Sequence, residues 1–213
     1  MIDLALAEGW VEPELAREFP ELRLIYAPLS ARPRASTPEV RERLRGLADR
    51  YTGAKVVHMR QDSVPWAYRV FSRQVGIDPD TDRTPVEALA VERLRHGGLQ
   101  SENLVDDALT IAIAETGVPV FALDADKLDG QLGLRLAREG EWLSERRAVA
   151  AGQLVVADER CPVALVMGEV SARAGVTADT RRMVVCALRV KGVAPIVAEE
   201  ALWIVGETLG DSA

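Results

Sequence analysis

Apolar and polar residues along this chain follow two different periods. Residues 104–114 are mostly apolar, and they are preceded by Asn103, whose side chain can accept hydrogen bonds from the first N–H groups of a helix. Gly117, which is followed closely by a proline, marks the end of that helix. Across residues 132–136, leucines alternate with glycine and arginine, which is the two-residue period of a strand. The pattern predicts a helix over 103–116 followed by extended structure.

The same periods extend to both sides of this stretch. Threonine–proline steps at 37–38 and 84–85 are typical helix starts, because proline suits the first helical position. A glycine at 53 is expected to end the helix that starts at 38. Helices are predicted at residues 12–18, 38–51, 64–75, 84–96 and from 195 onward. Strands are predicted at residues 22–28, 118–121, 132–137, 153–158, 162–167 and 182–190.

Length and composition are those of an ordinary soluble protein. The chain has 213 residues, of which 48% are apolar and 28% charged, and a single domain over residues 1–213 is expected. No apolar run is long enough for a membrane span, and no signal peptide is apparent at the N-terminus. Cys161 and Cys186 are too few for a disulfide framework. A cytoplasmic, reduced protein is the simplest interpretation, and the oligomeric state is left open.

The charge balance bears on possible partners. The formal net charge of −7 argues against broad, nonspecific binding to nucleic acid. It does not exclude one local basic surface, because nearly all the basic residues are arginines, which suit phosphate groups better than lysines do. The excess of arginine also follows from genome composition alone, so by itself it identifies no partner.

Familiar catalytic motifs are missing from the sequence. It contains no Gly-x-Ser-x-Gly, Gly-x-Gly-x-x-Gly or Gly-Lys-Ser/Thr pattern. His58 and His96 lie far apart, and neither cysteine has a nearby histidine or cysteine with which to share a metal. The sequence gives little support for a triad hydrolase, a dinucleotide enzyme or a zinc enzyme, and neither a metal nor a cofactor is expected.

An ordered series of short motifs runs through the second half of the chain. In order, the motifs are Gly97-Gly98, Val105-Asp106, Gly117-Val118-Pro119, Phe121-Ala122-Leu123-Asp124, Asp126-Lys127-Leu128, Leu134-Arg135, Gly140-Glu141, the segments 155–158 and 162–169, and Thr180. No single motif is specific, but their order is. Over about residues 85–190 the chain resembles the B3/B4 domain, which occurs in the β subunit of bacterial phenylalanyl-tRNA synthetase and as freestanding proteins.

This resemblance implies an α+β fold, with a mixed β-sheet flanked by helices. It also implies a function, because the synthetase domain hydrolyses the ester that joins a wrong amino acid to tRNA. Such an ester is already activated, so a site can work by holding a water and polarising a carbonyl group. The first hypothesis is a freestanding editing domain, an aminoacyl-tRNA deacylase that acts in trans on mischarged tRNA. The alternatives are a non-catalytic module that binds tRNA or an amino-acid-like ligand, and an interaction domain with a decayed pocket.

The resemblance assigns two candidate catalytic residues to the region after the central strands. Gly168-Glu169 matches a step whose glutamate, in the synthetase, recognises a hydroxyl group of the misacylated amino acid. Thr180 matches the threonine that follows this step. Glu169 is equally suited to be a surface residue at a strand end, and Thr180 is equally suited to cap a turn.

The helix predicted at 103–116 supplies further candidates. Asn103, Asp106 and Thr110 fall on one helical face and would form the polar wall of a pocket, with Asp106 in a catalytic role. Asn103 and Asp106 equally fit a helix cap and a complement to the helix dipole, and that structural interpretation is preferred for Asp107.

Departures from the synthetase pattern change the expected pocket. Phe121 stands where the synthetase has a histidine, and Ala108 and Leu109 replace its Thr-Asn pair. A pocket between the helix, residues 118–124 and the loop at 168–169 should therefore be more apolar, with Glu169 buried as its main polar group. The predicted substrate-binding residues are Asn103, Ala108, Leu109, Thr110, Phe121 and Gly168.

Arginines near the motifs are the candidates for contact with tRNA. They are Arg69 and Arg73 on the helix before the motifs, and Arg146 and Arg147 after them. Arg135 is expected instead to stabilise the turn at Gly140-Glu141.

Overall fold

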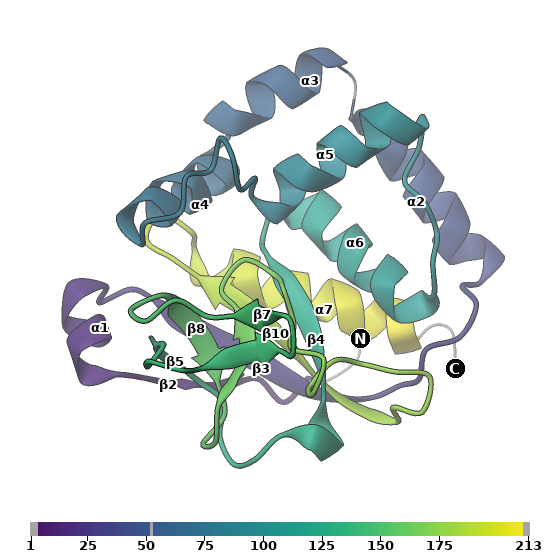
Figure 1. The fold of residues 1–213 in the computed structure, drawn as a ribbon. Helices are drawn as coiled ribbons and strands as arrows, with labels where there is room; N and C mark the ends of the chain where they lie inside the picture. The colour runs from purple at the N-terminus through teal and green to yellow at the C-terminus, as the bar shows by residue number, and fades with distance from the viewer. Residues whose placement is uncertain (1–3, 52, 211–213) are drawn as a thin grey trace.

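The computed structural model describes residues 4–51 and 53–210, with most helices before residue 117 and most strands after it (Figure 1). The helices are α1 (Pro13–Glu18), α2 (Pro38–Arg50), α3 (Gly53–His58), α4 (Ser63–Gln74), α5 (Pro85–His96), α6 (Leu104–Thr116) and α7 (Pro195–Gly210), with short 3-10 turns at Met59–Gln61 and Ala125–Lys127. The strands are β1 (Ala7–Glu8), β2 (Trp10–Val11), β3 (Arg23–Ser30), β4 (Val120–Asp124), β5 (Gly133–Leu136), β6 (Trp142–Ser144), β7 (Arg147–Ala148), β8 (Leu154–Ala157), β9 (Pro162–Leu165) and β10 (Arg182–Arg189). The predicted α+β fold class is confirmed.

Most strands belong to two four-stranded sheets. The first sheet has the order β1-β3-β10-β4 and is antiparallel throughout. The second sheet has the order β2-β5-β8-β9, and it is mixed because β2 runs parallel to β5. β6 and β7 pair with each other as a separate hairpin.

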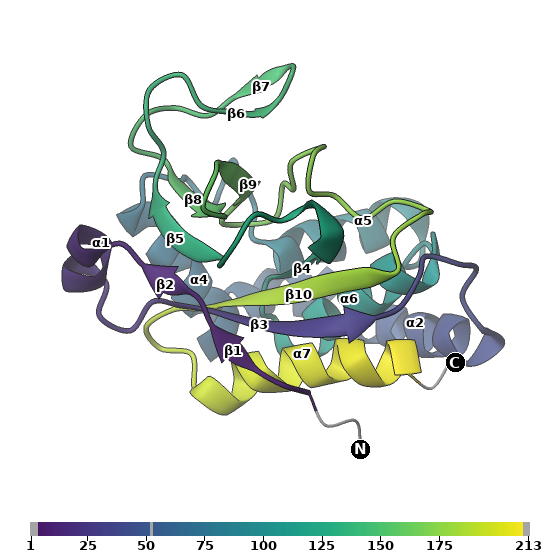
Figure 2. The same cartoon turned by 90° about the horizontal axis from the view of Figure 1, so that it is seen from below.

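The first sheet forms the middle of the molecule (Figure 2). α6 and α7 pack against each other and on its strands β4 and β10, while the second sheet lies over its other side. One large cluster of buried apolar side chains joins these layers, for example Ile111 of α6, Leu123 of β4, Val156 of β8 and Leu202 of α7. Every residue of β4 is buried, as expected for a strand covered on both faces.

The ends of α6 are fixed by the residues that the sequence indicated. Asn103 is the N-cap, and its side-chain oxygen accepts hydrogen bonds from the N–H groups of Val105 and Asp106. Gly117 ends the helix with a φ of 74°, a left-handed conformation that glycine adopts without strain. From Gly117 a connection of only three residues leads the chain from the last turn of α6 to the start of β4.

Several features of the fold differ from the sequence-based expectation. The strands form two sheets, and β3, which lies far before the motifs, is a central strand between β1 and β10. α3 begins at Gly53, where only a helix end was expected, and the polar segment at 144–149 forms part of the β6–β7 hairpin. The segments at 132–137 and 153–157 were expected in one sheet, and β5 and β8 are indeed neighbours in the second sheet. No helix within the described ranges has the length and apolar character needed to cross a membrane.

Candidate functional site

A cavity of about 490 Å³ opens between α6, β4 and the loop after β9, and we call it the α6 pocket. These are the three segments between which the sequence placed a pocket. The residues that line it are Gln100, Glu102, Val105, Asp106, Asp107, Leu109, Thr110, Ile113, Val120, Phe121, Ala122, Gly168, Val170, Gly175 and Val176.

Helical periodicity explains which side chains of α6 reach the pocket. Leu109 and Thr110 lie three and four residues after Asp106, and Ile113 lies four and three residues after them, so all four share one face of the helix. The amide of Asn103 donates a hydrogen bond to a carboxylate oxygen of Asp106, which orients that carboxylate at the helix start. Asn103 itself does not line the pocket, so its role is to cap the helix and hold Asp106.

Thr110 presents a free polar group one turn further along α6. Its hydroxyl makes no hydrogen bond to any residue within the described ranges, and its side chain is half-buried. Asp106 and Thr110 both line the pocket from α6, and Phe121 lines it from β4.

Asp107 is buried and fully engaged beside the pocket. Its carboxylate accepts hydrogen bonds of 2.5 Å from the hydroxyls of Ser36 and Ser101, and one of 2.9 Å from the backbone N–H of Glu102. These bonds fasten two loops to the first turn of α6. The carboxylate therefore acts as a structural anchor, in agreement with the interpretation that the sequence favoured.

The apolar candidates divide between pocket and core. Phe121 and Leu109 line the α6 pocket, whereas Ala108 is completely buried in the core and does not. Most of the lining is apolar, as the departures at Leu109 and Phe121 led us to expect, but Glu102 adds a carboxylate that the sequence did not indicate.

Glu169 is not the buried polar group that the sequence predicted. Its side chain is 51% exposed and lies 3.4 Å from the Nε of Arg147. It lines a neighbouring cavity rather than the α6 pocket, and Gly168, whose φ is 127°, lines both. The reversal occurs because the chain turns at Gly168 and directs the next side chain away from α6.

Thr180 lies outside the α6 pocket. It is buried, its hydroxyl donates a 2.6 Å hydrogen bond to Asp124, and it accepts one from the N–H of Thr177. Burial opposes ionisation of Asp124, but hydrogen bonds from Thr180 and Lys127 outweigh it and lower the pKa of that carboxyl. The structure supports the turn-capping alternative for Thr180 and removes it from the candidate catalytic residues.

Arg69 also needs correction as a candidate for tRNA contact. The residue is only 4% exposed, and its guanidinium donates hydrogen bonds of 2.7 Å to Glu87 and 2.5 Å to Asp80. A guanidinium held in this way between α4 and α5 cannot reach a phosphate backbone. The sequence gave no sign of the pairing because its two partners come from separate later segments.

The other three arginines predicted to contact tRNA are exposed to solvent. Arg73 is half-exposed and lies 3.4 Å from Asp80, while Arg146 and Arg147 are exposed at the β6–β7 hairpin. Arg135 donates two hydrogen bonds, of 2.7 and 2.5 Å, to the carboxylate of Glu141. This contact confirms that Arg135 stabilises the turn at Gly140-Glu141.

Sequence reasoning missed part of the pocket wall. Glu102 and Gln100 come from the α5–α6 loop, and Gly175 and Val176 come from the segment before β10. An isolated bridge between Leu123 and Gly175 brings that segment to β4. The Gly97-Gly98 motif lies in the first of these loops but gives no sign that Gln100 and Glu102 face a pocket, and residues 175–176 fall between the quoted motifs.

The described residues offer no evident metal centre. Across residues 4–51 and 53–210, no group of three or more histidine, cysteine, aspartate or glutamate side chains is arranged to hold a metal ion. The α6 pocket is lined by carboxylates, the Thr110 hydroxyl and apolar side chains.

Comparison with known sequences identifies the class of domain. The B3/4 domain family model matches residues 67–198, and the chain belongs to this family. The match includes α6, β4 and the loop after β9, the three segments that form the α6 pocket.

The similar curated proteins are phenylalanine–tRNA ligase beta subunits. The subunit of Methylococcus capsulatus is 38% identical over 95 residues, that of Streptomyces avermitilis 34% over 99 residues, and that of Gloeobacter violaceus 42% over 101 residues. These matches cover 41%, 44% and 44% of this chain, but 12% of each relative. The chain thus corresponds to a small part of those subunits.

Proposed function

We propose that the α6 pocket binds the aminoacyl end of a mischarged tRNA and hydrolyses its ester, with the tRNA delivered in trans in the cytoplasm. Water would attack the ester carbonyl carbon, the bond to the terminal ribose oxygen would break, and the free amino acid and the tRNA hydroxyl would leave. The observation that carries the proposal is that Asp106 and Thr110 line one cavity from α6, together with Phe121 from β4, within the region matched by the family.

The charge of the pocket suits an aminoacyl ester. Such an ester carries a positive ammonium group but no free carboxylate, because the carboxyl group is esterified. Glu102, Asp106 and the hydrogen-bonded Asp107 line the pocket with three carboxylates, whereas its lining contains no arginine or lysine. The electrostatic attraction therefore favours the ester, and it disfavours retention of the product amino acid, whose carboxylate is restored.

The hydrolytic step is assigned to a bound water. The described lining contains no histidine, cysteine or serine side chain that would serve as a nucleophile or a strong base. Asp106 and Thr110 lie one turn apart on α6, so a water between them would donate a hydrogen bond to the carboxylate and interact with the hydroxyl. For an activated ester, orientation of the attacking water supplies a large part of the rate enhancement.

Selection among amino acids is assigned to the apolar part of the lining. Leu109, Ile113 and Phe121 form a surface with no fixed polar partner. Apolar surfaces of this kind discriminate mainly by size, with about 1–3 kcal/mol for each methylene group. We expect side chains that fill this space to be removed from tRNA faster than larger ones.

Deacylation of a panel of mischarged tRNAs tests the proposal. Asp106→Asn should lower the deacylation rate by at least about 100-fold, because the amide cannot accept the water's proton as the carboxylate does. Asp49→Asn, which changes an exposed aspartate of α2, is the matched control and should keep the wild-type rate. Wild-type rates in the Asp106 variant would exclude the assigned water site, and no turnover by the wild type on any tRNA would exclude the activity.

A second candidate function is binding of aminoacyl-tRNA without hydrolysis. It is favoured by Ala108, Leu109 and Phe121, which are apolar where the synthetase domain has polar residues. This function predicts that the wild type protects mischarged tRNA from spontaneous hydrolysis. The deacylation panel separates the two functions, because protection and acceleration have opposite signs in the same assay.

A further inference from the structure

The β6–β7 hairpin forms one wall of a further cavity of about 440 Å³, which we call the Trp142 cavity. The hairpin projects from the second sheet on the side away from α7 (Figure 2). Trp142 and Leu143 line the cavity from the hairpin, Pro162 lines it from the start of β9, and Ala172 and Arg173 line it from the loop after β9. Its volume is in the range of small-ligand sites, which is about 300–1,000 Å³.

Strand alternation leaves the indole of Trp142 uncovered. Leu143, the next residue of β6, is 3% exposed and packs in a small apolar cluster with Val149 and Val155, so Trp142 lies on the opposite face of the strand and is 55% exposed. Its partner across the hairpin is Ala148, whose methyl group is too small to cover an indole. Single exposed apolar side chains are common on protein surfaces, but this one lines a cavity and is held by a strand with a buried neighbour.

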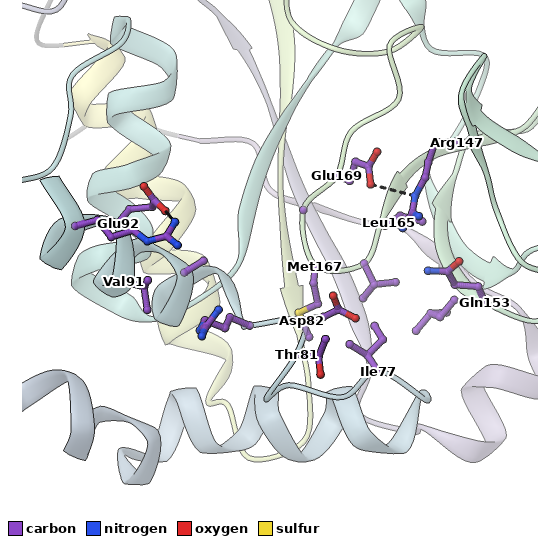
Figure 3. Close-up of a pocket in the computed structure, with 16 residues that line it drawn as sticks. Ile77, Thr81, Asp82, Val91, Glu92, Arg147, Gln153, Leu165, Met167 and Glu169 are labelled. Atoms are coloured by element: carbon purple, nitrogen blue, oxygen red, sulfur yellow. Dashed lines mark hydrogen bonds and ion pairs between the residues drawn. The ribbon is translucent and has the colours of Figure 1, made fainter.

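Arginines supply positive charge beside this indole. Arg146, in the turn of the hairpin, is exposed and forms no hydrogen bond or ion pair with any residue that the structure describes. Arg147 lies 3.4 Å from Glu169 (Figure 3), and water screens that pair because both side chains are about half exposed. Arg173 lines the cavity itself and donates a 2.6 Å hydrogen bond to Asp158. An uncovered indole beside guanidinium groups suits a ligand that combines a flat ring with negative charge.

The loop after β9 connects the Trp142 cavity to the α6 pocket. Val170 lines the α6 pocket, and Ser171, the next residue, lines the Trp142 cavity. The loop is fixed at this point, because the N–H of Ser171 donates a 2.8 Å hydrogen bond to the carbonyl of Val163 and Val170 forms a bridge with Ala164. A strand of a few nucleotides with its end in the α6 pocket can therefore reach Trp142.

We propose that the Trp142 cavity binds an unpaired base near the 3′ end of tRNA, stacked on the indole. This inference rests on the proposed function, because it takes tRNA as the ligand and places the aminoacyl end in the α6 pocket. Unpaired bases stack on aromatic side chains with little dependence on sequence, and arginines neutralise the phosphates beside them. Glu145 also lines the cavity, and its carboxylate can accept a hydrogen bond from the exocyclic amino group of adenine or cytosine.

The 3′ end suits this site better than the rest of a tRNA does. Bases within a duplex are already stacked on their neighbours, so an unpaired segment gains most from contact with an indole. The 3′ end is such a segment, and it also carries the amino acid. A base held at Trp142 would fix the strand on the surface and so position the ester for the α6 pocket.

Titration of two forms of one tRNA tests the site. Fluorescence anisotropy compares the intact deacylated tRNA with the same tRNA lacking its unpaired 3′ nucleotides, at one fixed salt concentration. Trp142→Ala should weaken binding of the intact tRNA by about 5- to 150-fold, the range expected for the loss of one stacked base. The truncated tRNA should bind the wild type and the variant equally, because it has no base to place on the indole.

Matched variants separate stacking from a general effect on the protein. Trp142→Phe keeps an aromatic ring and should bind the intact tRNA within about threefold of the wild type. Trp66→Ala removes a tryptophan of similar exposure, 51%, from α4 and should change neither titration.

A second pair of variants leaves the indole in place. Ala172→Glu adds a carboxylate to the cavity from an exposed position and should weaken binding of the intact tRNA by at least about threefold, because it repels the phosphates. Ala150→Glu makes the same change of charge at an exposed position outside the lining and should leave the affinity for the intact tRNA unchanged.

Wild-type affinity of Trp142→Ala for the intact tRNA would overturn the stacking site. An equal loss of affinity for the intact and the truncated tRNA would also overturn it, because Trp142 would then act elsewhere than at the 3′ end. If the wild type binds and deacylates tRNA while Trp142→Ala binds as tightly, only the stacking site fails. If the wild type binds intact tRNA through Trp142 without deacylating it, the stacking site stands and the proposed hydrolysis fails. If the wild type binds no tRNA, both fail.

Discussion

At the scale of single residues, a buried carboxylate after β8 holds neighbouring loops in place through hydrogen bonds. Asp158 is buried at the end of β8, and one of its oxygens accepts a 2.6 Å hydrogen bond from Arg173. Backbone N–H groups of Asp129, Arg160 and Cys161 supply further hydrogen bonds. Burial opposes ionisation of Asp158, but these donors outweigh it and lower the pKa of the carboxyl.

This lowered pKa gives a prediction for stability against pH. Because the folded-state pKa lies below the unfolded value, ionised Asp158 stabilises the fold above about pH 4. That contribution is lost as the pH falls through the folded-state pKa. Asp158→Asn should therefore lower the free energy of unfolding by about 1–3 kcal/mol at pH 7, and the difference from the wild type should shrink at pH 3.

Urea unfolding at the two pH values measures both quantities. Asp49→Asn, at an exposed position of α2, serves as the control and should stay within about 0.5 kcal/mol of the wild type at both. A deficit of the Asp158 variant that is the same at pH 7 and pH 3 would contradict the assigned ionisation.

At the scale of elements, one bidentate ion pair closes the connection between β5 and β6. Arg135 of β5 is buried and donates hydrogen bonds to both carboxylate oxygens of Glu141. Glu141 also accepts a 2.7 Å hydrogen bond from the backbone N–H of Arg138. The hydrogen bond from Arg135 is the main cause that lowers the pKa of Glu141. Since Glu141 retains only slight exposure, solvent screens this pair less than a surface pair.

A double-mutant cycle tests this element. Arg135→Met leaves a nearly buried glutamate without its partner and should lower the free energy of unfolding by about 3–5 kcal/mol. Arg135→Met combined with Glu141→Gln should lose less than the sum of the two single variants, because each single change leaves the other group unpaired. Additive losses in chemical unfolding would show that the two side chains do not stabilise each other.

At the scale of the whole molecule, the distribution of charge determines where a polyanion such as tRNA could bind. The net charge is −7, so tRNA binding requires a local basic surface that overcomes a repulsive field. Arg146 and Arg147 are exposed together at the β6–β7 hairpin. The two arginines of the hairpin are thus the candidates for contact with the tRNA backbone, whereas Arg69 is buried.

The salt dependence of tRNA binding tests this surface. Replacement of Arg146 and Arg147 by glutamine should reduce the slope of log K against log salt by about two, because each phosphate contact contributes about 0.9. Anisotropy titrations with deacylated tRNA between about 50 and 200 mM salt measure the slope. Glutamine at the exposed Arg32 and Arg34 is the control of equal charge, and an equal reduction there would assign the effect to net charge alone.

The sequence by itself determined most of the helices, α3 excepted, and the order of the family motifs. Those features depend on residues close together in the chain, such as Asn103 before the first turn of α6 or the capping box of Thr84 and Glu87 at α5. The helical period likewise determined that Asp106 and Thr110 share a face. Family resemblance added the class of fold and the three segments that form the α6 pocket.

Only the tertiary structure decided which strands pair and which polar residues are buried. β3, β4 and β10 are all largely apolar, so their patterns allow many pairings, and the division into two sheets depends on contacts between distant segments. The burial of Arg69 depends on Glu87, 18 residues away, and that of Thr180 on Asp124, 56 residues away. The exposure of Glu169 depends on the turn at Gly168. Side-chain burial is set by partners that meet only after folding, and local sequence does not specify those partners.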